Sequence, residues 1–294
     1  MKEKTIYALG FFDGVHKGHQ ALLLACKHLA QRTGCTAGAV TFTSHPDTLV
    51  TGQTPLLINT AQQRQEMLRE FGIFSVTALP FDEQLMNMPW QDFLEDLVQK
   101  GAAGFVCGDD FRFGFRGEGT AQLLADFCKE RNLPCAIVPG QTVDGIRVSS
   151  THIRQLLEVG QMEQAVRFLG HPHCLSGEVV SGRGLGHTIG IPTANLTLPE
   201  GVVCPKYGVY ACKAVVDGQE YLAVTNIGTR PTVGGHRATV ESWLLDFEGD
   251  LYGKTLTLHF YAFLRSEQKF GSLEELQTEI QKNAEQTRKI LEIL

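Results

Sequence analysis

Two histidines, His16 and His19, stand in a glycine-rich segment of sequence GFFDGVHKGH, which covers residues 10–19. A strand-like run precedes the segment at 5–9, and a helix-like run follows it at 20–25. The amino end of a helix attracts phosphate through unpaired N–H groups and the helix dipole. Imidazoles placed there can donate hydrogen bonds to charge that develops on a phosphoryl group. For the string H-x-G-H alone, a turn with two surface histidines is an equal alternative; the flanking elements favour nucleotide chemistry.

Three later segments of the first half carry polar or aromatic residues after strand-like runs or at a helix start. Their sequences are TFTSHP at 41–46, GDDFRFG at 108–114 and RVSSTHIR at 147–154. All three fall at the strand-exit edge of the predicted sheet, where open α/β sheets bind ligands. Phe111 beside Arg112 suits a flat heterocycle, although a plain loop is the alternative for that segment.

The third of these segments offers groups that suit phosphate oxygens. Ser149, Ser150 and Thr151 carry hydroxyls, and Arg154 carries a planar fork of N–H donors. Taken alone, this is an ordinary capped helix start. Together with the histidine segment, it predicts the second half of a triphosphate clamp.

The second half contains another glycine-rich string, GRGLGHTIGIPTAN, at residues 182–195. Its glycines, Gly182 and Gly190 among them, free backbone N–H groups to wrap phosphates. Thr193 and Asn195 lie two apart, so an extended chain points both side chains the same way. A hydroxyl and an amide oxygen are hard ligands suited to Mg²⁺. A solvent-exposed hairpin is the alternative for Thr-x-Asn taken alone.

The elements that position these residues alternate in the first half, which predicts βαβ units around a doubly wound parallel sheet. Two short helices close this half, one that begins at Ser149-Ser150-Thr151 and one at about 162–169, and Gly170-His171-Pro172-His173 then breaks the pattern. We therefore expect one domain over 1–169 and a second over 170–294. The expected strands are 5–9, 37–42, 73–79, 104–107 and 135–138, and the helices are 19–31, 61–71, 90–100 and 120–131.

The second half is typical of a small antiparallel β-barrel followed by a C-terminal helix. Glycine, proline and Asp-Gly turns separate its short strand-like runs. Ser272 begins a capping-box match, and Leu273, Leu276 and Ile280 share one face of the last helix. The expected strands are 177–181, 208–216, 220–227, 239–247 and 255–263.

Composition excludes several classes of protein. With 43% hydrophobic and 20% charged residues, the chain of 294 residues is typical of one large or two ordinary globular domains. The net charge of −6, without a long Lys/Arg block, argues against broad nucleic-acid binding. The eight cysteines form no C-x-x-C pair, so free thiols in a reducing cytoplasm are expected rather than zinc. No stretch suits a membrane span or a signal-peptide core, and no feature demands an obligate protein partner.

The ordered motifs resemble those of the bacterial bifunctional riboflavin kinase/FAD synthetase family. The first-half matches are GxFDGxHxGH at 10–19, FRFG at 111–114 and SSTxxR at 149–154. In the second half, the PTAN segment at 192–195 and several further motifs occur in the same order as in the family, over residues 177–270. The resemblance covers nearly the whole chain. It implies a nucleotidyltransferase domain that shares its H-x-G-H signature with class I aminoacyl-tRNA synthetases, followed by a riboflavin kinase domain.

For the first half, the resemblance implies FMN adenylylation, in which FMN attacks the α-phosphorus of ATP, FAD forms and pyrophosphate leaves. His16 and His19 would stabilise the transition state, and hydroxyls with Arg154 would hold the β- and γ-phosphates. The expected ATP- or flavin-binding residues are Gly10, Phe12, Asp13, Gly18, Phe111, Arg112, Ser149, Ser150, Thr151 and Arg154.

For the second half, the resemblance implies phosphorylation of riboflavin by ATP. Glu241 would be the general base, although a carboxylate in an alternating strand commonly faces solvent. Thr193 and Asn195 would hold Mg²⁺ with ATP. The expected ligand-binding residues of this half are Gly182, Gly190 and Arg265.

The chain departs from the family pattern in several places. Thr43 begins the string TSHP where the family often has D-P-H-P, Asp110 stands where Asn is frequent, and His187 stands where Arg is usual. An enzyme with only one of the two activities is therefore an alternative. A flavin sensor without turnover would need the loss of Glu241 or of the histidine pair, and both are present. A class I synthetase is not favoured, because the chain has no K-M-S-K-S string, large insertion or basic surface.

Overall fold

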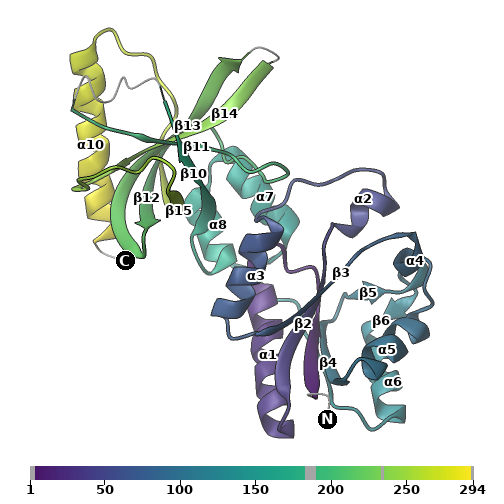
Figure 1. Ribbon diagram of the computed structural model, residues 1–294. Coiled ribbons are helices and arrows are strands. Elements are labelled where there is room, and N and C mark those ends of the chain that lie inside the picture. Colours follow the sequence, from purple (N-terminus) through teal and green to yellow (C-terminus); the bar gives the residue numbers. More distant parts are fainter. Residues whose placement is uncertain (1–3, 183–189, 233–234, 293–294) are drawn as a thin grey trace. The chain divides into compact units, whose positions relative to one another are not determined.

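The computed structural model describes residues 4–182, 190–232 and 235–292, and it consists of two compact units, Met1–Ser150 and Thr151–Leu294 (Figure 1). Helices α7 (Ser150–Val159) and α8 (Met162–Leu169) therefore group with the second unit, whereas the sequence places them in the first. The reason is that α8 packs on strands of the barrel. His187 lies outside the described residues.

The first unit contains the predicted parallel sheet, with strand order β3-β2-β1-β4-β7. Two short antiparallel pairs, β5 with β6 and β8 with β9, lie in the loops that follow β4 and β7. The strands are β1 Thr5–Leu9, β2 Thr36–Phe42, β3 Ser75–Leu79, β4 Ala102–Gly108, β5 Arg112–Phe113, β6 Gly119–Thr120, β7 Cys135–Val138, β8 Thr142–Val143 and β9 Ile146–Arg147.

Helices cover both faces of this sheet, which confirms the doubly wound prediction. Strand β1 is central: Ile6 and Ala8 pack with α1 and α3, while Leu9 packs on the opposite face with α5 and α6. Strand ends therefore stay fixed relative to one another, because the sheet is buried on both sides. The helices are α1 Lys17–Thr33, α2 Pro46–Val50, α3 Ala61–Glu70, α4 Glu83–Met86, α5 Trp90–Gln99 and α6 Ala121–Glu130, with 3₁₀ turns η1 Asp13–Val15 and η2 Phe115–Gly117.

The second unit is a closed antiparallel barrel with strand order β10-β11-β14-β13-β12-β15. The barrel was predicted, but the short strand β11 that completes it was not, because four residues give too little alternation to recognise. The strands are β10 His173–Val180, β11 Ala194–Thr197, β12 Gly208–Val216, β13 Gln219–Thr232, β14 Gly235–Leu244 and β15 Thr255–Arg265.

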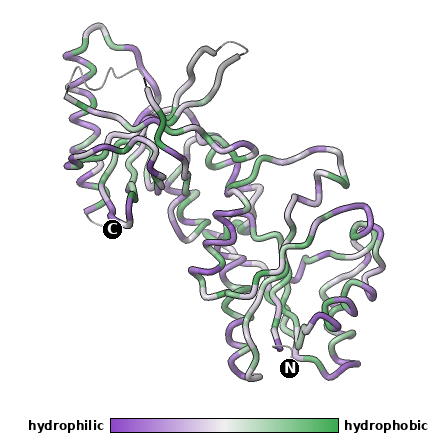
Figure 2. The backbone as a smooth tube through the Cα atoms, in the orientation of Figure 1, coloured by the Kyte–Doolittle hydropathy of each residue, from purple (hydrophilic) through white to green (hydrophobic). Residues whose placement is uncertain are grey.

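The predicted C-terminal helix, α10, runs from Leu273 to Leu291 and packs on the outside of the barrel. Its N-cap is Ser272, whose hydroxyl accepts the N–H of Glu275 at 3.2 Å. Hydrophilic and hydrophobic residues alternate along α10, as expected of an amphipathic helix (Figure 2). Ala284 belongs to the apolar cluster that attaches the helix to β12 and β13.

One buried histidine makes the barrel's stability depend on pH. His173 on β10 is 1% exposed, and neither ring nitrogen has a hydrogen-bond partner among the described residues. Burial, with a contribution from His171, lowers its pKa to about 3. Between pH 3 and 6.5 the unfolded chain therefore binds a proton that the folded chain does not, so stability falls as the pH falls.

Lowering the pH from 7 to 5 is therefore expected to decrease the free energy of unfolding of the parent protein by about 2 kcal/mol more than that of a His173→Leu variant. Urea unfolding can be followed by Trp243 fluorescence in a Trp90→Phe background, because these are the two tryptophans of the chain. Equal pH dependence of the two proteins would contradict this assignment.

Candidate active sites

Segments that follow the carboxyl ends of four parallel strands line one cavity of about 630 Å³ in the first unit. Gly10 and Phe11 come from the end of β1, and His45 from the end of β2. Residues 109–112 follow β4, and residues 139–141 follow β7. Since parallel strands end at one edge of the sheet, this is where the fold provides a ligand site.

The two predicted histidines lie together on this cavity. Their rings are stacked, with centroids 3.6 Å apart and planes within 10° of parallel. His16 is the N-cap of α1, and its Nδ1 accepts the backbone N–H of His19 at 3.3 Å. In neutral His16 the proton therefore lies on Nε2. The helix thus begins with an imidazole that can still donate a hydrogen bond.

His19 is held in its neutral form at physiological pH. Burial lowers its pKa well below the usual value, and the neighbouring His16 and Arg64 lower it further. The ring of Phe12 packs edge-on against His19, with centroids 5.3 Å apart. A neutral imidazole donates through one N–H and adds no charge to a site that already contains the helix dipole.

The turn that presents the histidines has an unusual backbone. Phe12 and Val15 have φ values of 61° and 38°, a region that side-chain-bearing residues rarely adopt. Such conformations cost about 1–3 kcal/mol each and persist where surrounding packing enforces them. Gly18 is needed for a different reason: a Cβ there would lie 3.1 Å from Cε1 of His16. The turn therefore fixes His16 closely against the start of α1.

Most of the predicted first-unit residues line the cavity, but two do not. Phe12 is fully buried in the apolar core, because its left-handed backbone turns the ring inward. Asp13 is 2% exposed, and its Oδ1 accepts the backbone N–H of Ile58 at 2.9 Å. Both side chains lie inside the turn rather than on the cavity, and their predicted ligand-binding role stays a prediction. Cavity-lining residues that were predicted are Gly10, His16, Gly18, His19, Phe111, Arg112, Ser149 and Ser150.

The serine segment is tied directly to the histidine turn. The hydroxyl of Ser150 donates to the carbonyl oxygen of Asp13 at 3.0 Å. Ser149 and Ser150 therefore reach the same cavity although more than a hundred residues separate them from the turn. Thr151 and Arg154 continue along α7 in the second unit, and their phosphate-binding role stays a prediction.

Sequence reasoning gave no role to an ion-pair cluster among the residues that line this cavity. Arg147 Nη2 lies 2.9 Å from Asp109 Oδ1 and 2.8 Å from Asp110 Oδ2. Asp109 also accepts the backbone N–H of Gly140 at 3.1 Å, which lowers the pKa of that carboxyl together with Arg147. The sequence signal was present, since both segments follow predicted strands, but their pairing depends on the fold.

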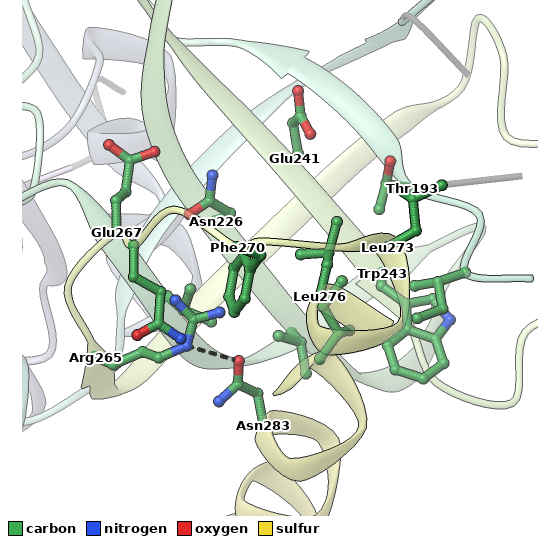
Figure 3. A pocket seen from close by; sticks show the side chains of 15 residues that line it. Thr193, Asn226, Glu241, Trp243, Arg265, Glu267, Phe270, Leu273, Leu276 and Asn283 are labelled. Atoms are coloured by element: carbon green, nitrogen blue, oxygen red, sulfur yellow. Dashed lines mark hydrogen bonds between the residues drawn. The ribbon is translucent and has the colours of Figure 1, made fainter. Parts of the chain in front are cut away.

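The second unit contains a separate cavity of about 320 Å³ between the barrel and α10 (Figure 3). Glu241 on β14 lies opposite Asn195 on one neighbouring strand and opposite Asn226 on the other. Directly opposed residues of antiparallel strands point to the same face. Glu241, Asn226 and Thr193 all line the cavity. The register therefore brings the predicted base and the predicted metal ligands together.

Thr193 lies where two cavities of the second unit meet. It lines the cavity of Glu241 and also one of about 540 Å³ that is lined by Ser242, Phe247 and Tyr252. Ser242 follows Glu241 on β14, so the two side chains point to opposite faces of the strand. A group held at Thr193 can therefore contact one ligand on each side of this strand.

Residues missed by sequence reasoning form the apolar walls of the Glu241 cavity. Trp243 lies two residues after Glu241 on the same face of β14, a spacing that could have revealed it. Leu276 and Ile280 come from α10, whose docking is not encoded locally. The predicted residue Arg265 also lines the cavity, and its Nε donates to Oδ1 of Asn283 on α10 at 3.1 Å.

The donor set around Thr193 and Asn195 fits Mg²⁺. Asn195 Nδ2 donates to the carbonyl oxygen of Thr193 at 3.3 Å, which ties the two residues together. A Cβ on Gly182 would overlap the amide of Asn195, so the backbone at this glycine lies directly against that amide. Within the described ranges no cluster of three His, Cys, Asp or Glu side chains could hold a metal. An ion here would take further ligands from phosphate and water. Gly190 has a left-handed φ of 70°, and its ligand role stays a prediction.

Replacing Gly182 with alanine is expected to lower turnover at the second-unit site about 100-fold, because the new methyl group displaces the Asn195 amide. Turnover at the first-unit site is expected to be unchanged. Gly177→Ala on β10 is the matched control, since its Cβ would find no atom nearer than 3.3 Å. Steady-state rates of both reactions measure the effect; a Gly182→Ala enzyme as active as the control would contradict it.

The two units define a transferase with two nucleotide-processing sites, one on a parallel α/β sheet and one on a barrel. Family models for FAD synthetase and riboflavin kinase match residues 1–152 and 169–291. The chain belongs to the bifunctional riboflavin kinase/FMN adenylyltransferase family.

Individual relatives cover nearly the whole chain. The bifunctional riboflavin kinase/FMN adenylyltransferase of Listeria monocytogenes is 33% identical over 96% of this chain and 91% of its own. The Escherichia coli K12 protein of the same name is 36% identical over 95% and 90%. A crystal structure described as a macrolide-efflux protein from Streptococcus pneumoniae has a TM-score of 0.90 at 30% identity, covering 98% of this chain and 95% of its own. Among the described residues, no helix is both long and apolar enough to cross a membrane.

Proposed function

We propose that this protein makes FAD from riboflavin in two ATP-dependent steps, with phosphorylation in the second unit and adenylylation in the first. One observation carries the proposal: a single chain contains two separate cavities, each with the polar groups that its step needs. The first has stacked imidazoles at a helix start, and the second has Glu241 between two amides. Membership of the family supports both steps.

In the kinase step, the flavin ring occupies the apolar part of the 320 Å³ cavity, beside Trp243, Leu276 and Ile280. The ribityl chain then extends toward Glu241. Glu241 accepts the proton of the 5′-hydroxyl as its oxygen bonds to the γ-phosphorus of ATP, and ADP leaves. ATP occupies the neighbouring cavity of about 540 Å³. Thr193 lines both this cavity and the one that holds the flavin.

In the adenylyl-transfer step, a phosphate oxygen of FMN bonds to the α-phosphorus of a second ATP. The bond between the α-phosphorus and the oxygen that bridges it to the β-phosphorus breaks, and pyrophosphate leaves. His16 and His19 donate hydrogen bonds to charge that develops on the transferring group, at the positive end of α1. Ser149 and Ser150 reach the same cavity. A phosphate-binding role for Thr151 and Arg154 stays a prediction.

We also propose that Mg²⁺ serves the kinase step, held with ATP by Thr193 and Asn195. The ion would neutralise phosphate charge. We propose that residues 1–169 form the adenylyl-transfer domain and that residues 170–294 form the kinase domain. A cytoplasmic location is supported by the eight cysteines, all within the described residues and none in a disulfide.

The test is incubation of the purified full chain with riboflavin, ATP and Mg²⁺, followed by chromatographic separation of flavins. FMN and FAD are expected, and supplied FMN with ATP is expected to give FAD and pyrophosphate. FMN alone would reduce the proposal to the kinase step. FAD from FMN without FMN from riboflavin would reduce it to the adenylyl-transfer step. Omission of Mg²⁺ tests the metal requirement.

A further inference from the structure

Arg64 on α3 is a buried cation behind the cavity of the first unit. It is 2% exposed, and one nitrogen, Nη2, donates to the carbonyl oxygen of Phe42 at 2.9 Å. Its Nε and Nη1 are also buried, and neither has a hydrogen-bond partner among the described residues. A guanidinium has five N–H donors, so most of its hydrogen-bonding capacity is unused.

Such a group is costly to stability. Burying a charge without full pairing carries a desolvation penalty that a well-packed apolar side chain would avoid. The carboxylate of Asp13 favours the charged form of Arg64, but Asp13 already binds the N–H of Ile58. A cation in this position is therefore poorly explained by the packing of α3 alone.

The contacts of Arg64 lead to the cavity. Its guanidinium lies over the ring of Phe11, 4.2 Å from the centroid. That ring also packs edge-on with His45 at 4.7 Å, and the Phe11 carbonyl oxygen accepts the hydroxyl of Thr41 at 2.9 Å. Phe11, Phe42 and His45 all line the cavity. Arg64 itself is not among the lining residues.

The charge of Arg64 also acts on His19, since it contributes to the lowered pKa of that imidazole. Charges interact more strongly through a buried, water-poor region than through solvent. Three carboxylates face the same cavity, so a fixed positive charge behind the histidines offsets their repulsion of phosphate. These carboxylates are Asp47, Asp109 and Asp110, and the facing cations are Arg112 and Arg147.

We propose that Arg64 is a positioning residue for adenylyl transfer: it fixes the Phe11 and Phe42 wall and supplies buried positive charge behind the two imidazoles. The ligand on which it acts is the triphosphate of the nucleotide. The proposal rests on the adenylyl-transfer function of the first unit. Arg64 touches no reacting atom and acts through Phe11, Phe42 and the local field.

The test compares Arg64→Met, which keeps much of the side-chain volume but removes the charge, with Arg64→Lys, which keeps the charge. Arg69→Met is the matched control, because Arg69 is exposed on the same helix. The measurements on the full chain are kcat and KM for FAD formation, the rate of FMN formation, and the thermal unfolding midpoint. The kinase reaction of the same chain serves as an internal measure of intact protein.

Arg64→Met is expected to lower kcat/KM for ATP in FAD formation about 10- to 100-fold. Its unfolding midpoint is expected to equal or exceed that of the parent, since a costly buried charge is gone. Arg64→Lys is expected to stay within about threefold of the parent in kcat/KM. FMN formation and the Arg69→Met control are expected to be unchanged.

Parent-like FAD formation by Arg64→Met would overturn the proposal. A loss that Arg64→Lys does not restore, or one that accompanies a lowered unfolding midpoint, would also overturn it, because it would show a purely structural role. If the parent protein itself forms no FAD from FMN and ATP, the function proposed for the first unit fails instead.

Discussion

Replacing His19 with alanine is expected to lower kcat for FAD formation from FMN about 10²- to 10³-fold. The physical reason is the loss of one donor from a fixed pair whose rings are stacked 3.6 Å apart at the start of α1. His19 is a better choice than His16, because His16 also caps the helix and its loss would change the local fold. Rates of FAD and pyrophosphate release measure the effect.

The control for this variant is His28→Ala. His28 lies on the same helix but is exposed and does not line the cavity. It is expected to leave both reactions unchanged, and His19→Ala is expected to leave FMN formation from riboflavin unchanged. Loss of both reactions in a folded His19→Ala protein would contradict the division into two sites.

Replacing Glu241 with glutamine is expected to lower kcat for FMN formation about 10²- to 10⁴-fold. The amide keeps the size and most hydrogen-bonding capacity of the side chain, but it cannot accept the proton of the flavin hydroxyl. The cross-strand neighbours Asn195 and Asn226 stay in place, so riboflavin binding is expected to persist. Quenching of flavin fluorescence measures binding, and chromatography of FMN measures turnover.

An exposed carboxylate of the same barrel supplies the matched control. Glu178 on β10 lines neither cavity of the second unit, so Glu178→Gln is expected to behave like the parent. FAD formation from supplied FMN should continue in both variants. Undiminished FMN formation by Glu241→Gln would remove Glu241 from the role of general base.

Local patterns in the sequence were enough to predict much of the architecture. The bounds of β1, β7 and β12 agree with the structure, because each is a short apolar run between clear turn signals. The capped start of α10 was also predicted, since Ser272 and the residues after it carry the signal within one helical turn. Such features depend on neighbours in sequence, where periodicity and caps act.

For each site, the sequence predicted separate motifs but not how their side chains are arranged in space. The glycine spacing and the histidine pair marked the first cavity, and Thr193 with Asn195 marked the second. The ring of Phe12, a predicted ligand-binding residue, lies in the core, because its left-handed backbone carries the ring inward. Nothing in the local pattern distinguishes that direction from the opposite one.

Tertiary structure alone decided which distant residues meet. Strand register places Glu241 between Asn195 and Asn226, and helix docking buries Arg64 behind the histidines. A shift of register by one residue would turn Glu241 to the other face of its strand. The sequence by itself therefore determined the elements and the chemical groups, whereas long-range pairing and packing determined which of these groups act together.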